Sequence, residues 1–361
     1  MKVGIIGLGR VGAEFSLDEK RGQLASHVSC YNADPRVDSI ACCDVDSNKV
    51  TNALKQIDKP KEAYTNYKQM MVEFQPQIVS ICTPTPTHAE ITCNVAKHDC
   101  VTNILLEKPI SQTLAEAEVI IEACKGKRLM INYARRWSKL YRDTFRICRF
   151  GSSIGWLSIT GVHPGPVLRT GTHMIDLFNW AFEWSIPETV QAFSKPTLAP
   201  YMSATNDYCL NGVINYRDGT AILLGQEMPY LQFELDMRFK DSRVIIGDNG
   251  LTKKTYLMDD SENYSKLKEL SFAEHLAFQR EPLLMNAIGE AIGTASMRPE
   301  QTVTCKAPFY ELAPKTLPNS CPGEAGADAL LVALGLHYSA THGNCLVKLS
   351  DVPQDYSIRS Y

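Results

Sequence analysis

The stretch Met1-Lys-Val-Gly-Ile-Ile-Gly-Leu-Gly-Arg-Val-Gly12 decides the fold. Its apolar run at positions 3–6 is typical of a strand that is buried on both faces. Glycines follow at the spacing GxGxxG, where they permit a tight turn, a close approach of backbone to a pyrophosphate and close helix–strand packing, and the next helix N-terminus offers amide donors. An ordinary glycine-rich turn has the same pattern, so the spacing needs support from downstream. The predicted cofactor-binding loop consists of Gly7, Leu8, Gly9, Arg10, Val11 and Gly12.

A second strand is predicted at residues 38–43, and it ends on Asp44. In dinucleotide-binding folds an acid at this strand end hydrogen-bonds the adenosine ribose and repels a 2′-phosphate, so Asp44 favours NAD over NADP. Asp44 lies farther from the glycines than the usual ~20 residues, and we attribute the excess to a polar insertion around Leu17–Gly22. Asp46 competes for the ribose role, and helix capping is the alternative role of both aspartates.

Two later buried strands each run into a distinctive loop. The strand at 77–82 meets Thr83-Pro-Thr-Pro-Thr-His88, whose prolines stop it at the carboxyl edge of the sheet, where ligands bind in open α/β proteins. The strand at 100–106 ends in Glu107-Lys108-Pro109, an unusual setting for a solvent-facing lysine. His88 has the alternative role of starting the next helix. The cofactor contacts expected from these loops are Thr83, Pro84, His88, Glu107 and Lys108.

The alternation of strands and helices up to residue 133 predicts a parallel, doubly wound (Rossmann) sheet. One of its helices is expected at 111–123, with Ser111 as the N-cap. From residue 135 onward the pattern changes to alternating stretches with a turn at Arg217-Asp-Gly219, which predicts a C-terminal α+β domain with a largely antiparallel, open sheet. We therefore expect a dinucleotide-binding domain at 1–134 and a substrate-binding and oligomerisation domain at 135–361, with a shared interface and cleft.

Composition excludes several classes of protein. The chain has 361 residues and a formal net charge of −3 with scattered charges, so it lacks the basic footprint of a nucleic-acid binder. No run approaches the ~18 apolar residues of a membrane span. The 12 cysteines form no CxxC pair, which favours reduced packing thiols in a cytoplasmic protein over disulfides or a metal site. The expected partner is a small molecule.

The motifs together resemble the Gfo/Idh/MocA oxidoreductase family over nearly the whole chain. The resemblance rests on the glycine loop, the strand-end aspartate and the two loops above. Further elements are the segment Asn132-Tyr-Ala-Arg-Arg-Trp137, the helix start Gly171-Thr-His-Met-Ile-Asp176 and the helix end Ser339-Ala-Thr-His-Gly343. The Glu-Lys-Pro tripeptide combined with GxHxxD at this separation is the most specific part.

The resemblance implies an NAD(P)-dependent enzyme that acts on a secondary alcohol or ketone of a carbohydrate: a sugar, a polyol or a sugar nucleotide. It places Lys108 beside the reacting oxygen and has His173 face that oxygen from the second domain. Hydride transfer leaves a hydroxyl proton to be removed and an alkoxide to be stabilised. Desolvation and a nicotinamide cation would lower the pKa of Lys108 from ~10.4, whereas a histidine ordinarily titrates near neutrality without such a shift, so His173 is the leading acid/base. A buried structural histidine is the alternative for His173.

One departure from the family pattern concerns the substrate. Arg169 stands where many members carry an acid or amide, four residues before His173, so a carboxylate that would orient the imidazole is missing. An arginine there suits a carboxylate or phosphate on the substrate, and we expect an acidic substrate. Asp176 is expected to brace His173 or to solvate its helix. Arg136 is expected to contact substrate or nicotinamide, with a solvated surface arginine as the alternative.

Four functions remain open from the sequence. The leading one is a cytoplasmic NAD-dependent sugar or polyol dehydrogenase. The others are an NADPH-dependent ketosugar reductase, a glycosidase that oxidises and re-reduces its sugar with bound NAD, and a non-catalytic NAD-binding regulator. The apolar face of an open sheet further predicts a homodimer or homotetramer.

Overall fold

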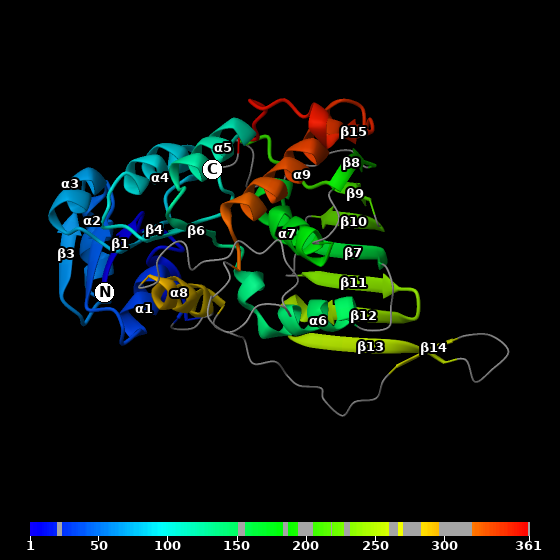
Figure 1. The fold of residues 1–361 in the computed structure, drawn as a ribbon, viewed down its shortest axis with the longest axis horizontal. Coiled ribbons are helices and arrows are strands. Elements are labelled where there is room, and N and C mark those ends of the chain that lie inside the picture. The colour runs from blue at the N-terminus through cyan, green and yellow to red at the C-terminus, as the bar shows by residue number, and fades with distance from the viewer. Residues whose placement is uncertain are drawn as a thin grey trace. The chain divides into compact units, whose positions relative to one another are not determined.

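The computed structural model describes residues 1–19, 24–150, 156–182, 187–193, 205–217, 219–226, 232–259, 266–269, 283–295 and 320–359 (Figure 1). The chain divides into two compact units. The first comprises Met1–Trp137 with Pro282–Ala327, and the second comprises Ser138–Glu281 with Asp328–Tyr361. The last of the three boundaries, between Ala327 and Asp328, falls inside the long helix α9 (Gly323–Thr341). The domain bounds expected from the sequence, 1–134 and 135–361, stay a prediction.

The first unit is built on a six-stranded sheet in the order β3-β2-β1-β4-β5-β6, with every pair parallel. This confirms the predicted doubly wound sheet. The chain leaves β1 toward β2 on one side and returns to β4 on the other, so the carboxyl ends of β1 and β4 flank the point where such sheets bind ligands. The strands are β1 (Lys2–Ile6), β2 (Ser39–Cys43), β3 (Lys61–Tyr64), β4 (Ile78–Ile81), β5 (Asn103–Leu106) and β6 (Arg128–Ile131).

Helices cover both faces of this sheet. A single apolar core joins α1, α2 and α8 to the strands on one face, and α4 and α5 lie on the other (Figure 1). The helix expected from Ser111 begins later: Thr113 caps it and exchanges hydrogen bonds with Glu116, so the assignment of Ser111 was wrong. The helices are α1 (His27–Ala33), α2 (Ser47–Leu54), α3 (Tyr67–Glu73), α4 (His88–Ala96), α5 (Leu114–Ala123) and α8 (Leu283–Thr294).

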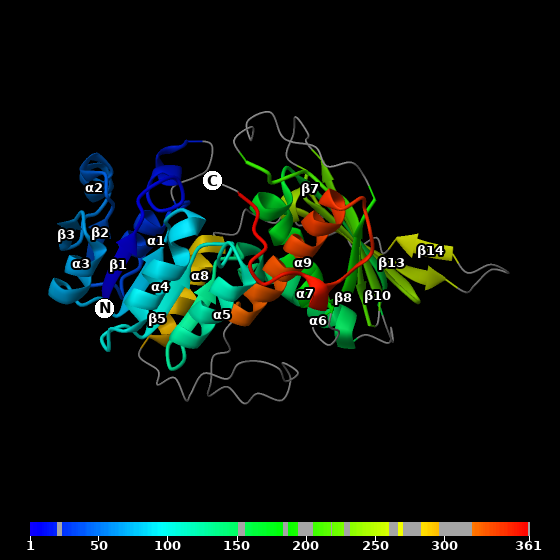
Figure 2. The ribbon, with the colours of Figure 1, turned by 90° about the horizontal axis from the view of Figure 1, so that it is seen from above.

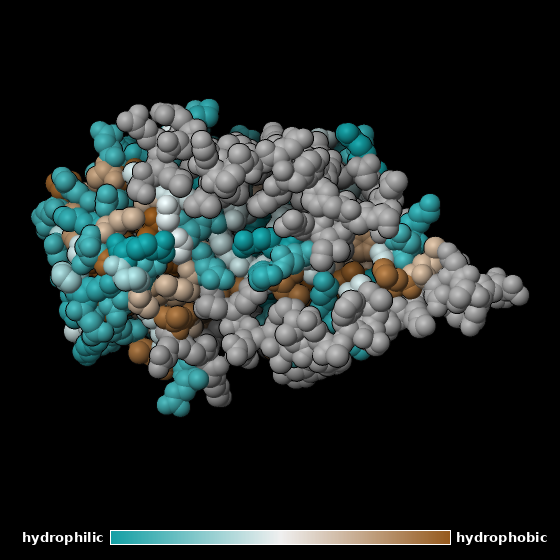
Figure 3. All heavy atoms as spheres, turned by 60° about the horizontal axis from the view of Figure 1, so that its bottom comes forward, coloured by the Kyte–Doolittle hydropathy of each residue, from teal (hydrophilic) through white to brown (hydrophobic). Residues whose placement is uncertain are grey.

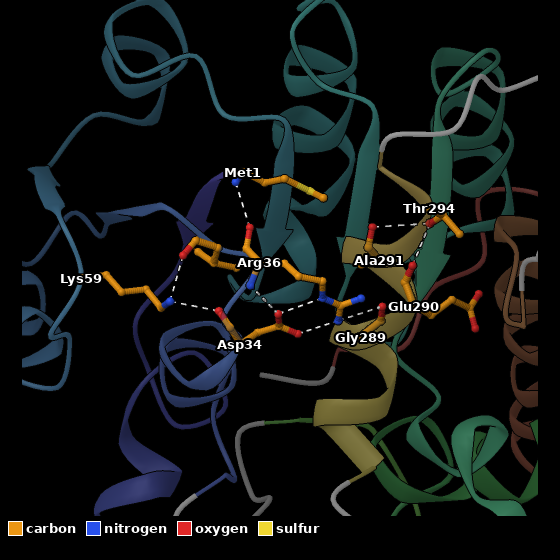
Figure 4. Close-up of polar contacts among 9 residues, drawn as sticks. Met1, Asp34, Arg36, Lys59, Gly289, Glu290, Ala291 and Thr294 are labelled. Atoms are coloured by element: carbon orange, nitrogen blue, oxygen red, sulfur yellow. Dashed lines mark hydrogen bonds and ion pairs between the residues drawn. The ribbon is translucent and has the colours of Figure 1, made fainter.

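Helix α8 comes from late in the chain and is fixed to the first unit by polar contacts. Arg36 makes a two-pronged contact with the buried carboxylate of Asp34, at 2.9 and 2.6 Å, and its guanidinium reaches the carbonyl of Gly289 on α8 (Figure 4). Farther along α8, the side chain of Asn103 on β5 donates to the carbonyl of Ala291 at 2.6 Å and to the hydroxyl of Thr294 at 2.8 Å.

A half-buried carboxylate forms the other half of this attachment. Glu290 on α8 accepts from the guanidinium of Arg128 at 2.6 Å and from the indole of Trp137 at 2.8 Å. It also accepts from the backbone amide and the hydroxyl of Ser320. The Arg128 side chain is only 3% exposed, so Glu290 neutralises a charge that is almost completely withdrawn from water.

The second unit contains a nine-stranded sheet in the order β14-β13-β12-β11-β7-β10-β9-β8-β15. Its neighbours are antiparallel except β7 and β10, which confirms the largely antiparallel sheet. Tyr216 and Gly219 pair across the expected turn. The strands are β7 (Trp156–Pro164), β8 (Pro187–Ala192), β9 (Asn211–Tyr216), β10 (Gly219–Gln226), β11 (Glu234–Phe239), β12 (Ser242–Gly247), β13 (Thr252–Asp259), β14 (Lys266–Glu269) and β15 (Val347–Lys348).

Helices lie against one face of this second sheet. The helices of the unit are α6 (Lys139–Phe150), α7 (Thr172–Ala181) and the part of α9 beyond Ala327. Figures 1 and 2 show α7 and α9 alongside the strands around β7 and β10. A Cβ at Gly161 would meet Met174 of α7, and one at Gly212 would meet Leu336 of α9, so glycines let both helices approach closely.

Within the described ranges, no helix is both long enough and apolar enough to cross a bilayer. The face in Figure 3 is mostly hydrophilic where residues are described, with hydrophobic side chains in small separate groups. No disulfide joins the described cysteines, and burial raises the pKa of the Cys42 thiol to about 12.

Candidate functional site

Each glycine of the GxGxxG loop has its own steric reason. Gly7 has φ +90°, and a Cβ there would lie 2.7 Å from the backbone of Cys82 and Thr83. A Cβ at Gly12 would lie 2.1 Å from the carbonyl oxygen of Gly7. At Gly9 a Cβ would meet nothing within 4 Å. Gly7 and Gly12 therefore shape the loop, while Gly9 leaves space above it where a ligand can approach the backbone.

The loop itself offers the hydrogen-bond donors for an anion. Within the part of the chain that the structure describes, the amides of residues 9–12 donate to no atom. The first amides of α1 are used otherwise: His27 and Val28 donate to the carbonyls of Val11 and Gly12, each at 3.0 Å. The expectation that the following helix supplies the donors was therefore wrong, because the loop's own carbonyls occupy the first amides of α1.

Asp44 and Asp46 have different environments. The Asp44 carboxylate accepts from the amide of Leu8 at 2.7 Å and from the amide of Asp46 at 3.0 Å, which ties the end of β2 to the glycine loop. Asp46 caps α2 by accepting from the amide of Asn48 at 2.9 Å. Capping thus accounts for Asp46, while Asp44 is half-buried beside the loop. The ribose contact of Asp44 stays a prediction.

A histidine links the loop after β4 to the loop after β5 by hydrogen bonds. His88 is 1% exposed, and its ring nitrogens each lie 2.9 Å from a carbonyl oxygen, one of Pro109 and one of Thr83. Burial lowers the pKa of His88. Thr83 is half-buried and accepts from the hydroxyl of Thr87, and Pro84 is exposed. His88 thus joins the two loops, and its contact with a cofactor stays a prediction.

Glu107 and Lys108 follow β5 but differ in exposure. Lys108 is half-buried, whereas Glu107 is 9% exposed and accepts from His27 Nε2 at 3.0 Å and from Asn132 Nδ2 at 2.6 Å. Burial opposes ionisation of Glu107, but these hydrogen bonds and the charges of His27 and Lys108 outweigh it, so the pKa of its carboxyl is lowered. No sequence motif predicts this contact of His27, which lies 80 residues from Glu107.

The predicted cofactor residues therefore collect at one edge of one sheet. They follow the carboxyl ends of β1, β2, β4 and β5, which are neighbours in the parallel sheet. The contacts between Leu8 and Asp44 and between His88 and Pro109 show that these loops touch. Amide donors, a carboxylate and a lysine at one sheet edge fit a dinucleotide and a group beside it that loses a proton.

In the second unit, the predicted acid/base stands at an irregular helix start. His173 is the second residue of α7 and is half-buried. A π-helical turn at Val167–Gly171 precedes it, with the amide of Gly171 donating to Pro166 at 3.0 Å. Such turns are frequent at functional sites. Asp207 was not predicted as a site residue. It is fully buried and accepts hydrogen bonds from the amides of Leu168 at 2.9 Å and Arg169 at 3.0 Å.

Three predicted substrate residues have defined surroundings. Asp176 is 1% exposed, so the alternative that it solvates its helix was wrong. Arg169 is half-buried in the π-helical turn. Arg136 is half-buried in a 3-10 helix, Ala134–Trp137, and donates to the carbonyl of Ser320 at 3.2 Å, so it is not a freely solvated arginine. Their contacts with substrate stay predictions.

A second histidine of this unit, His163 on β7, was also missed. It is fully buried, and among the described residues neither ring nitrogen has a hydrogen-bond partner. A Cβ at Gly171 would lie 3.1 Å from its ring and one at Gly225 would lie 2.7 Å from it, so the imidazole fills the space between β10 and the start of α7. Burial lowers the pKa of His163 to about 4.

The parallel sheet and its glycine loop define the class of the first unit as a dinucleotide-binding Rossmann fold. Residues 1–134 match the family model described as the oxidoreductase family with an NAD-binding Rossmann fold, Gfo/Idh/MocA. The match confirms the resemblance predicted from the motifs.

Three known proteins are similar to the chain. D-glucoside 3-dehydrogenase of Escherichia coli K12 is 24% identical over 221 residues, which span 54% of this chain and 57% of that protein. The structure of myo-inositol 2-dehydrogenase from Lactobacillus plantarum has a TM-score of 0.68 at 20% identity and covers 96% of this chain and 99% of its own. An oxidoreductase from Agrobacterium radiobacter in complex with NAD+, L-tartaric acid and magnesium has a TM-score of 0.70 at 14% identity, covering 97% and 98%. At these identities the structures support the fold.

Proposed function

We propose that this protein is an NAD-dependent oxidoreductase that moves a hydride between nicotinamide and a secondary alcohol or ketone of a sugar, polyol or sugar nucleotide. The observation that carries the proposal is the sheet edge where the glycine loop, Asp44 and Lys108 follow neighbouring parallel strands. The family match and the sugar and inositol dehydrogenases among similar proteins support the same chemistry.

The residues at this edge fit the cofactor that the fold implies. The amides of residues 9–12 would hold a pyrophosphate, and the space over Gly9 lets it approach. Asp44 would accept from the ribose hydroxyls and repel a 2′-phosphate, which favours NAD, with NADP as the alternative. When bound, nicotinamide supplies the hydride acceptor or donor.

Lys108 and His173 are the proposed catalytic residues. Lys108 would stabilise the developing alkoxide with its ammonium group, and His173 would take up or return the hydroxyl proton. Buried Asp176 lies three residues after His173 on α7, a spacing that brings two side chains to the same helix face, and would brace the imidazole.

Arg169 provides the proposed preference for an acidic substrate. Its guanidinium would hold a carboxylate or phosphate by a two-pronged contact, which no neutral sugar offers. The relative whose complex contains L-tartaric acid supports an anionic ligand in this fold. Arg169→Ala should lower kcat/KM for sugar acids and sugar nucleotides by about 10- to 100-fold, equal to about 1.4–2.7 kcal/mol, and leave neutral polyols nearly unchanged. An unchanged preference would remove the proposal for Arg169.

The test of the function is a panel of sugars, inositols, sugar acids and sugar nucleotides with NAD and NADP, followed by the absorbance of reduced nicotinamide. Lys108→Met and His173→Ala should each lower turnover by at least about 100-fold while NAD binding remains. Glycoside cleavage without net reduction of NAD would indicate the glycosidase. NAD binding that alters a partner's activity, with no turnover even by the wild type, would indicate a regulator.

We also propose that the protein acts in the cytoplasm as a homodimer or homotetramer. On the face of the second sheet opposite α7 and α9, half-buried apolar residues stand in register on neighbouring strands: Val162 beside Leu224, and Ile222 beside Val213. A second copy of the chain that packs on this face would withdraw them from water.

A further inference from the structure

A buried chain of hydrogen bonds ends on the carboxylate that precedes Lys108. His27, the first residue of α1, is fully buried, with Nε2 at 3.0 Å from Oε1 of Glu107 and Nδ1 at 3.0 Å from Oγ of Ser80. The hydroxyl of Tyr31, also fully buried, lies 2.9 Å from the same Ser80 Oγ. Side chains from α1, β4 and the end of β5 are thus linked inside one unit.

The direction of the central bond follows from its acceptor. The lowered pKa of Glu107 leaves an ionised carboxylate at neutral pH, and an ionised carboxylate only accepts hydrogen bonds. His27 Nε2 therefore carries a proton and donates to Oε1, which also accepts from Asn132 Nδ2 at 2.6 Å. Two donors on one buried oxygen leave the Glu107 side chain a single position.

Its location distinguishes the hydrogen bond between His27 and Glu107 from other buried polar contacts of the core. Asn103, four residues earlier on β5, is equally buried and bonds to α8, away from the carboxyl edge. Glu107 stands at the edge and is directly bonded along the chain to Lys108, whose charge also acts on it. A shift of Glu107 would therefore move both the backbone and the electrostatic surroundings of the lysine.

We propose that His27 is a positioning residue for Lys108, acting through the hydrogen bond from its Nε2 to Glu107. The inference rests on the proposed function, because Lys108 is the group that meets the substrate. His27 touches neither substrate nor cofactor in this role. It sets the place and charge of the carboxylate from which the lysine extends.

Two similar substitutions of His27 test the roles of its two ring nitrogens separately. The amide nitrogen of His27→Gln can take the place of Nε2 and reach Glu107, whereas that of His27→Asn takes the place of Nδ1 and reaches only Ser80. His27→Asn should lower kcat by about 10- to 100-fold with the KM for NAD within about threefold of the wild type, and His27→Gln should recover most of kcat. The matched control Asn103→Leu should lower stability without lowering kcat.

A second measurement needs no turnover. Reductive methylation of the protein, followed by peptide mass spectrometry, gives the rate at which Lys108 is labelled relative to exposed Lys97. A lysine released from its position is more accessible, so Lys108 should label several-fold faster in His27→Asn than in the wild type and in His27→Gln.

The outcomes distinguish the two proposals. If the wild type turns over no substrate, the proposed function fails, and the labelling rates still decide whether His27 positions Lys108. Equal kcat and equal labelling in His27→Asn and His27→Gln would overturn the positioning role, as would an equal loss of kcat in Asn103→Leu. A variant that fails to fold is replaced by Tyr31→Phe, which weakens the same chain from its far end and should increase Lys108 labelling.

Discussion

At the residue scale, two glycines of the loop have different expected roles: Gly12 shapes the loop, and Gly9 leaves room for a ligand. Gly12→Ala places a Cβ 2.1 Å from the Gly7 oxygen, so it should cost about 1–3 kcal/mol of stability and distort the loop. Gly9→Ala fills open space, so it should leave the free energy of unfolding within about 0.5 kcal/mol and still weaken NAD binding at least about 10-fold.

Urea unfolding and calorimetric titration with NAD check this pair. The loop would not be the pyrophosphate site if Gly9→Ala bound NAD as the wild type does. If Gly12→Ala were fully stable with unchanged binding, the close approach to Gly7 would not constrain the loop.

His163 predicts a pH dependence of stability. Its pKa is lowered to about 4 in the folded protein, against ~6.5 in an unfolded chain. As pH falls below 6.5, His163 becomes protonated in the unfolded chain but stays neutral in the folded protein. The free energy of unfolding therefore falls by about 1.4 kcal/mol per pH unit until pH reaches about 4. Above pH 6.5 this contribution is constant.

His163→Leu removes that proton uptake. Between pH 6.5 and 5 its unfolding free energy should fall by about 2 kcal/mol less than that of the wild type, measured by urea unfolding at each pH. Carboxylates and other histidines titrate in both proteins and cancel in the difference. Parallel pH profiles would show that His163 does not exclude the proton.

Single residues also show which features of the site could be predicted from the sequence. Asp44, Thr83 and Lys108 were predictable because parallel strands bring their carboxyl ends to one edge, so a residue's place after a strand gives its place in the fold. The contact of His27 with Glu107 was not, since nothing local marks a pair 80 residues apart. Thr113 could have been found, because Thr113-x-x-Glu116 is the capping-box pattern.

At the element scale, the half-buried carboxylate of Glu290 is one of the polar groups that attach α8 to the first unit. Glu290→Ala removes the acceptor that Glu290 offers to the 3%-exposed guanidinium of Arg128 and to the Trp137 indole, so it should cost about 3–5 kcal/mol. Glu290→Gln keeps an acceptor and should cost less. Glu122→Ala, which breaks an exposed ion pair with Lys125 in the same unit, should stay within about 0.5 kcal/mol.

Urea unfolding of the three variants provides the measurement. Similar losses in Glu290→Ala and Glu122→Ala would mean that the contacts of Glu290 do not hold α8 in place. The sequence did not assign α8 to the first unit, because helical periodicity predicts that a segment is amphipathic and does not identify the sheet that it covers. The start of α1 is a similar case, since the GxGxxG spacing does not reveal that the first amides of the helix donate to carbonyls of the loop.

At the scale of the whole molecule, two sheets explain why fold class was predictable and domain membership was not. Strand–helix alternation and strand–turn–strand alternation are local patterns, and each fixes the type of its sheet. The return of Pro282–Ala327 to the first unit is a long-range event, stabilised by contacts such as the one between Asn103 and Ala291. Local sequence patterns therefore do not predict which unit such a late segment joins.

Assembly provides the last prediction. Val213 lies in register with Ile222 on the face of the second sheet that faces away from α7 and α9, so a charge there would have to be buried in any interface formed by this face. Val213→Glu should convert a dimer or tetramer into a smaller species, measured by light scattering after size-exclusion chromatography. Val72→Glu makes the same change on α3, where the side chain is 65% exposed, and should leave the mass unchanged. A monomeric wild type would remove the assembly proposal, and an unchanged mass in Val213→Glu would place the interface elsewhere, because a buried carboxylate without a partner costs more than most interfaces gain from one valine.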